Sequence, residues 1–93
     1  TPSQMSGRID YGDMGGAIAA GAFKATTGKF KAVYAYAEHV CVHHGEVHLT
    51  DESGTTHVMK KGDSWFIAMG ETVIWDVKSD YVVKSFIVTP SKA

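Results

Sequence analysis

The sequence predicts one small domain built entirely from β-strands. Hydrophobic and polar residues alternate with a period of two over short segments, which is the pattern of half-buried strands. Ten glycines among 93 residues mark frequent turns. Roughly eight such segments, with turn signals about every eight to twelve residues, are typical of a β-sandwich or a β-barrel.

The first twenty residues carry weaker signals. Residues 1–13 are polar and show no sustained periodicity, so we interpret them as an arm or as a loosely held first strand. Residues 14–20 are small and apolar, but the surrounding glycines disfavour a helix, and we expect them to pack as a short buried segment. The predicted organisation is an N-terminal arm over residues 1–15, a barrel domain over 16–90 and a C-terminal tail over 91–93.

The remaining chain divides into strands at its turn residues. We expect strands over 22–26, 30–36, 38–43, 47–50, 55–59, 64–67, 72–77 and 81–88. The glycine of the hairpin turn at 51–54 can take the positive φ that such turns need, and further turns are expected at 27–29, 60–63 and 69–71. Residues 78–80 form the last predicted turn, and Pro90 ends strand pairing because it lacks an amide hydrogen.

Composition excludes several classes of protein. Nine Lys and Arg against ten Asp and Glu give a net charge of -1, and no basic cluster is longer than Lys60-Lys61, so no nucleic-acid partner is expected. No apolar run approaches the roughly 20 residues that span a bilayer, so no membrane association is expected. The single cysteine cannot form an internal disulfide. We therefore expect a cytoplasmic protein, with an export signal lost upstream of Thr1 as the open alternative.

An ordered set of residues between positions 21 and 88 resembles a known family. The set comprises Gly21 to Phe30 with its Thr-Thr-Gly-Lys-Phe turn, Glu38, Gly45-Glu46-Val47, Leu49-Thr50-Asp51, Gly62-Asp63, Phe66-Ile67, Gly70, Trp75 and Lys84. In this pattern the chain is similar to the cupins, and more narrowly to the small single-domain cupins grouped with ureidoglycine aminohydrolase and the ethanolamine-utilisation cupins. The resemblance implies a cupin jelly-roll β-barrel that acts on or binds a small metabolite.

The resemblance also bears on metal binding. In metal-binding cupins generally, two histidines and a glutamate come from the first motif and one histidine from the second. Counting from the glycines, the glutamate falls on Glu38, and the histidine positions fall on Ala32, Tyr34 and Val73. A divalent metal needs three or four converging ligands. We therefore expect neither a metal nor another cofactor.

Alternation along the strands predicts a pocket around Glu38. Tyr34, Tyr36 and Glu38 share one face of the chain, and Trp75 lies on the face of another strand. If these faces meet inside the barrel, the pocket has mostly apolar walls with a few polar groups, which suits a small molecule. We predict that Glu38 contacts or deprotonates a polar ligand, as the catalytic residue of any reaction. Tyr34, Tyr36 and Trp75 are predicted to bind that ligand.

Each of these residues also has a structural interpretation. Glu38 could be a strand residue hydrogen-bonded to a neighbour, although its motif position slightly favours function. Packing in the core is favoured for Trp75, because buried aromatic residues mostly pack. Lys84, on the last strand, is predicted to bind a ligand carboxylate, as the resemblance implies. The alternative is a lysine at the sheet edge that holds its ammonium group in water.

Three residues of one strand could suggest an external metal site. His39, Cys41 and His43 alternate at positions that face away from Glu38. On a straight strand they span about 13 Å, too far to converge on one ion. We interpret the histidines as surface or subunit-contact residues, and Cys41 as a buried structural thiol.

The other histidines have separate interpretations. His44 shares the parity of Glu38 but lies at the Gly45 corner, which makes it the best spare metal ligand. His48 and His57 lie on facing strands of one hairpin, and we expect them to be solvent-exposed cross-strand neighbours.

The favoured function is a cupin of unspecified activity that binds a small polar metabolite inside the barrel without the usual metal site, as a homodimer. An alternative is an enzyme, a hydrolase or an isomerase similar to ureidoglycine aminohydrolase, with Glu38 as acid or base and with or without a weakly held divalent metal. A third is a structural or regulatory module whose barrel binds nothing. An enzyme needs Glu38 beside another polar group in a cavity, a binder needs only the cavity, and a module would fill it with Tyr34, Tyr36 and Trp75.

Overall fold

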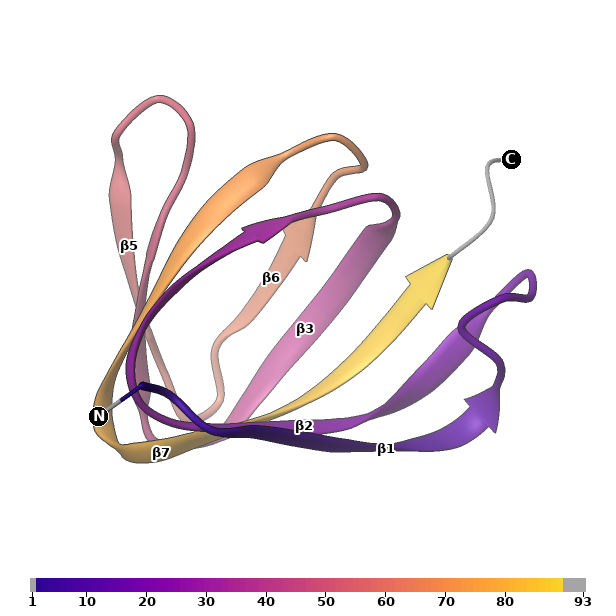
Figure 1. Ribbon diagram of the computed structural model, residues 1–93, viewed down its shortest axis with the longest axis horizontal. Coiled ribbons are helices and arrows are strands. Elements are labelled where there is room, and N and C mark those ends of the chain that lie inside the picture. Colours follow the sequence, from indigo (N-terminus) through magenta and orange to yellow (C-terminus); the bar gives the residue numbers. More distant parts are fainter. Residues whose placement is uncertain (1, 90–93) are drawn as a thin grey trace.

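The computed structural model describes residues 2–89, and within this range it contains seven strands and no helix (Figure 1). The strands are β1 (Met5–Gly12), β2 (Ala19–Val33), β3 (Ala37–His44), β4 (Glu46–Thr50), β5 (Thr56–Lys60), β6 (Ser64–Ile67) and β7 (Thr72–Thr89). The prediction of a single all-β domain is confirmed. Among residues 2–89 there is accordingly no helix long and apolar enough to cross a membrane. Pro90 and the predicted tail over 91–93 lie outside the described residues.

The two longest strands, β2 and β7, organise the sheet. Residues 19–26 of β2 pair with 81–88 of β7, and residues 28–33 pair with 72–77, all in antiparallel register. The first of these paired halves continues to β1 on one side and to β3 and β6 on the other. The second continues to β4 and β5. Figure 1 shows both strands turning through one corner, from which two facing layers diverge.

This corner replaces two predicted turns. The segments 27–29 and 78–80 lie inside the continuous strands β2 and β7, so the predicted chain reversals at these places are wrong. The register shifts between Thr26 and Gly28, where residue 27 of β2 faces residues 78–80 of β7. Extra residues on one strand of a pair bend both strands. The glycine and polar residues therefore mark a bend in a continuous pair.

Ser79 and its neighbours hold the corner in place. The Ser79 hydroxyl donates to the Tyr81 carbonyl at 2.8 Å and accepts a hydrogen bond from the Glu46 amide at 2.9 Å. The Thr27 hydroxyl donates to the Ser79 carbonyl from the opposite strand. Gly45, with φ of 90°, lies so close that an added Cβ would overlap the Tyr81 carbonyl oxygen and the Ser79 hydroxyl.

The N-terminal residues form part of the sheet. Residues 5–12 make the edge strand β1, paired with β2, which agrees with the strand alternative for this region; every residue of β1 is exposed. The prediction of a buried segment over 14–20 is wrong for Met14 and Ile18, which are 39% and 41% exposed, while Ala19 is fully buried. These residues connect the edge strand β1 to β2, so they turn the chain at the edge of the sheet.

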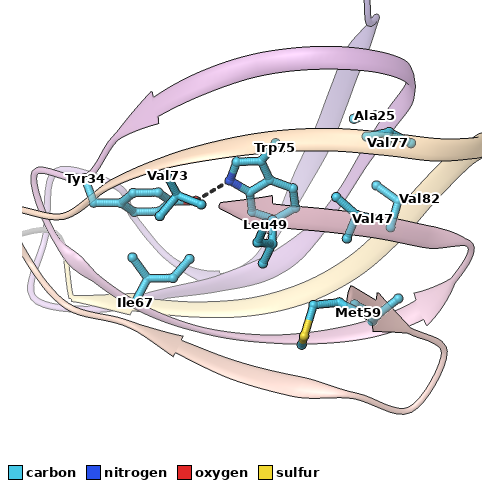
Figure 2. Close-up of a cluster of buried hydrophobic side chains, with 11 residues drawn as sticks. Ala25, Tyr34, Val47, Leu49, Met59, Ile67, Val73, Trp75, Val77 and Val82 are labelled. Carbon is cyan, nitrogen blue, oxygen red and sulfur yellow. Dashed lines mark hydrogen bonds between the residues drawn. The ribbon is translucent and has the colours of Figure 1, made fainter. Parts of the chain in front are cut away.

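The hydrophobic core lies between the two layers. Figure 2 shows aliphatic side chains from both layers gathered around Trp75, with Leu49 beside the indole. The buried members of the core are Ala25, Tyr34, Val42, Val47, Leu49, Met59, Ile67, Val73, Trp75, Val77 and Val82. Burial of an aliphatic side chain of this size contributes about 1.5–3 kcal/mol. Packing across the layers therefore holds the second layer, β4 and β5, against the first.

We predict that Gly45→Ala destabilises the protein much more than Gly62→Ala. Both glycines have φ near 90°, a strained value for alanine, which costs about 1–3 kcal/mol at either position. Only at Gly45 does the added methyl group also overlap neighbouring atoms, whereas nothing lies within 4 Å of the added Cβ at Gly62. Urea unfolding measures the difference. Equal losses for the two variants would show that the corner does not require glycine for space.

Candidate functional site

A cavity of about 590 Å³ opens between the two layers. Residues of β1, β2, β3 and β7 and of the β1–β2 and β2–β3 connections line it. Its wall includes Phe23, Phe30, Tyr34, Tyr36, Glu38, Trp75, Lys84 and Phe86. Tyr34 and Trp75 also belong to the core, so the cavity begins where the close packing ends.

A buried ion pair joins two strands in the cavity wall. The Lys84 ammonium group on β7 donates to the Glu38 carboxylate on β3 at 2.6 Å, and the side chains are 7% and 4% exposed. The register places Val88 opposite Glu38 and Val42 opposite Lys84, so the pair is diagonal across two neighbouring strands. Glu38 and Lys84 are the buried charged residues of the described chain.

Aromatic rings surround the ammonium group. Lys84 Nζ lies 4.6 Å from the ring centroid of Trp75, 5.1 Å from that of Phe23 and 5.8 Å from that of Phe86. Aromatic ring faces attract a cation at such distances. Lys84 and Trp75 are nine positions apart in β7, about 30 Å along a straight strand. The corner at 78–80 therefore brings them to one site.

Tyr34 and Trp75 form the polar part of the wall on the core side. Trp75 Nε1 donates to the Tyr34 hydroxyl at 3.1 Å (Figure 2). Trp75 is fixed further by Phe30, whose ring stacks on it with centroids 5.8 Å apart. Tyr36 meets the Tyr34 ring edge to face, also at 5.8 Å. This network orients the tyrosine and the indole without filling the cavity.

Burial changes the acidity of several groups here. Loss of solvent, and next the Glu38 charge, raise the pKa of Tyr34 above its ordinary value; the same two causes raise the pKa of Tyr36. Burial lowers the pKa of Lys84, and the charge and hydrogen bond of Glu38 oppose that effect without cancelling it. Both phenols therefore stay protonated, and the Lys84 amine holds its proton less firmly than a solvated lysine.

The rim of the cavity is apolar and exposed. Met5, Ile9, Met14 and Val33 line it with exposed fractions between 39% and 70%. Arg8 is the cationic residue of β1 at this rim, paired with Asp10 at 2.8 Å on the surface. A ligand that enters therefore passes apolar side chains before it meets the ion pair.

The structure brings all the predicted site residues together. Glu38, Tyr34, Tyr36, Trp75 and Lys84 line one cavity, as alternation along the strands indicated; their roles in binding or catalysis stay predictions. The alternative of Lys84 at a sheet edge is wrong, because β7 lies between β2 and β3 and the side chain is buried.

The positions that carry the metal ligands in metal-binding cupins do not form a metal site here. Among residues 2–89 no group of three or more His, Cys, Asp or Glu side chains is placed to hold a metal ion. Glu38 is the one carboxylate at the site, and an ammonium group already occupies it at 2.6 Å. The donor atoms therefore do not fit a divalent metal.

The outward face of β3 carries His39, Cys41 and His43, as predicted. Both histidines are exposed, and His43 Nε2 hydrogen-bonds the Ser85 hydroxyl at 2.7 Å. The prediction of a buried thiol is wrong, because Cys41 is only half-buried on this outer face. The alternation was correct, but no layer within residues 2–89 covers this side of the strand.

The other histidines correct three predictions. His44 is exposed and stacks on Tyr81 with centroids 4.4 Å apart, so it does not join Glu38 as a metal ligand. His48 and His57 are half-buried and not cross-strand neighbours, because His57 pairs with Leu49 and points to the inner side. A one-residue offset in hairpin register exchanges the two faces of a strand.

Sequence reasoning missed three kinds of residue at the site. It did not find the ion pair itself, because strand order and register between β3 and β7 are not visible in alternation alone. Phe23 and Phe86 were missed as aromatic neighbours of Lys84, although Phe86 shares the parity of Lys84. The rim from β1 was missed because residues 1–13 lack periodicity.

Comparisons with known proteins agree with this architecture. Residues 13–86 match the model of the EutQ-like cupin domain. The ethanolamine utilization protein EutQ of Salmonella typhimurium is 25% identical, with a TM-score of 0.75, covering 97% of this chain and 71% of that chain. Comparison with curated proteins gives no match. The prediction of a cupin barrel is confirmed, and so is the broader resemblance to the ethanolamine-utilisation cupins.

Two more distant structures share the fold. EutQ of Clostridium difficile is 17% identical, with a TM-score of 0.79, covering 96% of this chain and 70% of that chain. A protein of unknown function from Rhizobium leguminosarum is 20% identical, with a TM-score of 0.81, covering 98% of this chain and 86% of that chain. At these identities the likeness concerns the fold alone.

Removing either charge of the ion pair should be costly, and removing both should cost less than the sum. Glu38→Gln leaves a buried ammonium without a counter-charge, and Lys84→Met leaves a buried carboxylate; each should lower the free energy of unfolding by about 3–5 kcal/mol. The double variant should recover at least about 1–2 kcal/mol relative to additive losses. Urea unfolding of the four proteins measures the coupling.

Lys24→Met is the matched control for that cycle. Lys24 also lies over an aromatic ring, 4.5 Å from the Tyr81 centroid, but it is exposed and its loss should cost little. Additive losses at Glu38 and Lys84 would show that the two charges do not stabilise each other.

Stability should fall in alkali through Tyr34. Because the folded pKa of Tyr34 is raised, its stabilising contribution is complete below the unfolded pKa of about 10 and is lost as pH rises through the folded pKa. Between these values the free energy of unfolding should fall by about 1.4 kcal/mol per pH unit. Tyr34→Phe should lack this slope in urea unfolding at pH about 9 to 11.

In the difference between the native protein and Tyr34→Phe, the contributions of the other titrating groups to the pH dependence cancel. Lys84, with its lowered pKa, contributes with the opposite sign, but it is present in both proteins. An identical pH dependence in the two proteins would mean that the Tyr34 hydroxyl is accessible to water in the folded state.

Proposed function

The chain belongs to the EutQ-like cupin family, and from that premise we propose that it binds a small polar molecule in the cavity beside Glu38 and Lys84. The observation that carries this proposal is the buried ion pair at a cavity with unfilled space. A pocket for a small molecule typically has apolar walls and a few polar groups that orient the ligand. The cavity meets both conditions without a metal.

The energetics of the pair support a functional role. Burying two charges costs several kcal/mol per ion before they attract each other, and apolar residues of similar volume often stabilise as well or better. Glu38 and Lys84 therefore stabilise the barrel wall no better than apolar residues of similar volume would. A ligand that hydrogen-bonds to either charge would use this preorganised arrangement.

The surrounding rings indicate the kind of ligand. Phe23, Trp75 and Phe86 offer aromatic faces and edges around the Lys84 ammonium, and Tyr34 offers a protonated hydroxyl. These groups favour a flat, largely apolar body that carries one hydrogen-bonding group. The polar group would meet the ion pair, and the body would lie against the rings.

The cavity also favours binding over a purely structural module. A module would fill the barrel with Tyr34, Tyr36 and Trp75, but these side chains line about 590 Å³ of space. Association as a homodimer and a cytoplasmic location stay predictions of the sequence, together with the proposal that the partner is a small molecule.

A second candidate function is acid–base catalysis on the bound molecule. The observation that favours it is the 2.6 Å contact between Glu38 and Lys84, which places a proton donor and an acceptor side by side in a cavity. As a hydrolase or an isomerase, the protein would use Glu38 as the base. This extends the binding function and requires the same cavity.

We predict that benzamide binds in the cavity with a dissociation constant of about 1 mM or below. It has a flat ring and an amide that can accept from Lys84 and donate to Glu38. In Trp65→Phe the indole of Trp75 is the remaining tryptophan, since the chain has two, so its fluorescence reports on cavity occupancy. Ala32→Phe projects a ring into the cavity and should weaken binding at least about tenfold.

Val58→Phe is the matched control, because it adds the same ring at an exposed site outside the cavity. Chelator treatment should leave the affinity unchanged. Unchanged Trp75 emission with benzamide, or equal binding by both phenylalanine variants, would contradict the proposed site. A bound molecule labelled with deuterium on carbon could lose that label to water. If it did so, and Glu38→Gln abolished the loss, acid–base catalysis would become the favoured function.

A further inference from the structure

The Lys84 amine combines features that make a lysine nucleophilic. Its side chain is 7% exposed, yet it lines a cavity that a small molecule can enter. A desolvated lysine in an apolar pocket reacts with carbonyl compounds through its neutral amine, as Schiff-base lysines do. A carboxylate within reach of Nζ supplies the proton transfers that such a reaction needs.

We propose that Lys84 Nζ forms an imine with a small aldehyde or ketone bound in the cavity. This inference rests on the proposed function, because the carbonyl compound must first occupy the space beside Glu38 and Lys84. It names the chemical class of the ligand: a flat or apolar carbonyl compound small enough for about 590 Å³.

The surroundings of Lys84 favour the neutral form of its amine. The rings of Phe23, Trp75 and Phe86 replace water around Nζ. Burial lowers the pKa of Lys84. A solvated lysine is unprotonated in only roughly one molecule in 2,500 at pH 7, and each unit of lowered pKa raises that fraction about tenfold. The buried amine is therefore favoured over the surface lysines.

Glu38 can carry every proton of the reaction. It takes a proton from the Lys84 ammonium, and the freed lone pair forms the C–N bond while the C=O π pair moves to oxygen. Glu38 returns the proton to that oxygen, takes a second proton from nitrogen, and delivers it to the hydroxyl group. The C–O bond then breaks and water leaves, while the nitrogen lone pair forms the C=N bond. The products are a protonated imine and a carboxylate, so charge and protons balance and no oxidant or reductant is needed.

The product suits the site electrostatically. The imine nitrogen carries one positive charge beside the Glu38 carboxylate, so the product restores the ion pair of the starting state. Tyr34, which keeps its proton because its pKa is raised, remains a neutral donor in the same wall. Addition of water reverses the steps and releases the carbonyl compound.

The test uses benzaldehyde as probe and sodium cyanoborohydride as the hydride donor that makes the imine permanent. The full chain is incubated with both near pH 7, and mass spectrometry counts the benzyl groups added. Peptide mapping then locates them. We expect one benzyl group per chain, on Lys84, at least about tenfold above labelling of Lys24 or Lys31, both exposed.

Variants separate the amine from its surroundings. Lys84→Met together with Glu38→Gln removes the amine without leaving an unpaired buried charge, and this variant should lose the selective label. Lys24→Arg, at an exposed residue that does not line the cavity, should label as the native protein does. Because mapping on the native protein needs no variant, the result does not depend on whether the substituted proteins fold.

Benzamide distinguishes failure of this inference from failure of the proposed function. It has the same ring, but its carbonyl group does not form an imine. If benzamide binds and benzaldehyde labels Lys84 no more than surface lysines, the imine proposal is overturned and the binding site stands. If neither compound occupies the cavity, both proposals fail for this ligand class. Selective labelling that benzamide suppresses supports both.

Discussion

The bent pairing of β2 with β7 is the constraint on which the site depends. The two strands stay hydrogen-bonded to each other on both sides of the corner, so a bend in one requires a bend in the other. Each layer of the protein is built outward from one half of this pair. Because β2 and β7 belong to both layers, the layers cannot move apart without breaking β2–β7 hydrogen bonds at the corner. The corner therefore fixes the distance between the layers on that side of the cavity.

The same constraint sets the chemistry of the site. β7 contributes Trp75 before the corner and Lys84 after it, and the bend places the ammonium 4.6 Å from the indole ring. β3 pairs with residues 83–89 of β7 and adds Glu38 from the side. A charge pair between adjacent strands of one layer, surrounded by aromatic rings from both layers, is buried and still borders open space. The bend of β7 and its pairing with β3 thus produce both the buried ion pair and the open space beside it.

The sequence predicted the fold class and the face of each site residue better than it predicted connectivity. Alternation placed Tyr34, Tyr36, Glu38 and Trp75 on inward faces, because side-chain direction along a strand is a local property. It failed where long-range pairing decides. Gly28 looked like a turn, but pairing with β7 keeps the chain extended there. The partner of Glu38 was missed for the same reason, since only the β3–β7 register brings Lys84 to it.

The ion pair also explains how a cupin wall can keep its glutamate without the histidines. A carboxylate that is 4% exposed needs a nearby positive charge, whatever supplies it. In cupins that bind a metal, a divalent ion held by histidines would supply that charge. Here the histidine positions hold Ala32, Tyr34 and Val73, and an ammonium group from β7 neutralises Glu38. The positive charge beside the glutamate thus comes from an amine and not from a metal ion. In the proposed reaction this amine gives up a proton to Glu38 and then, once neutral, attacks a carbonyl carbon.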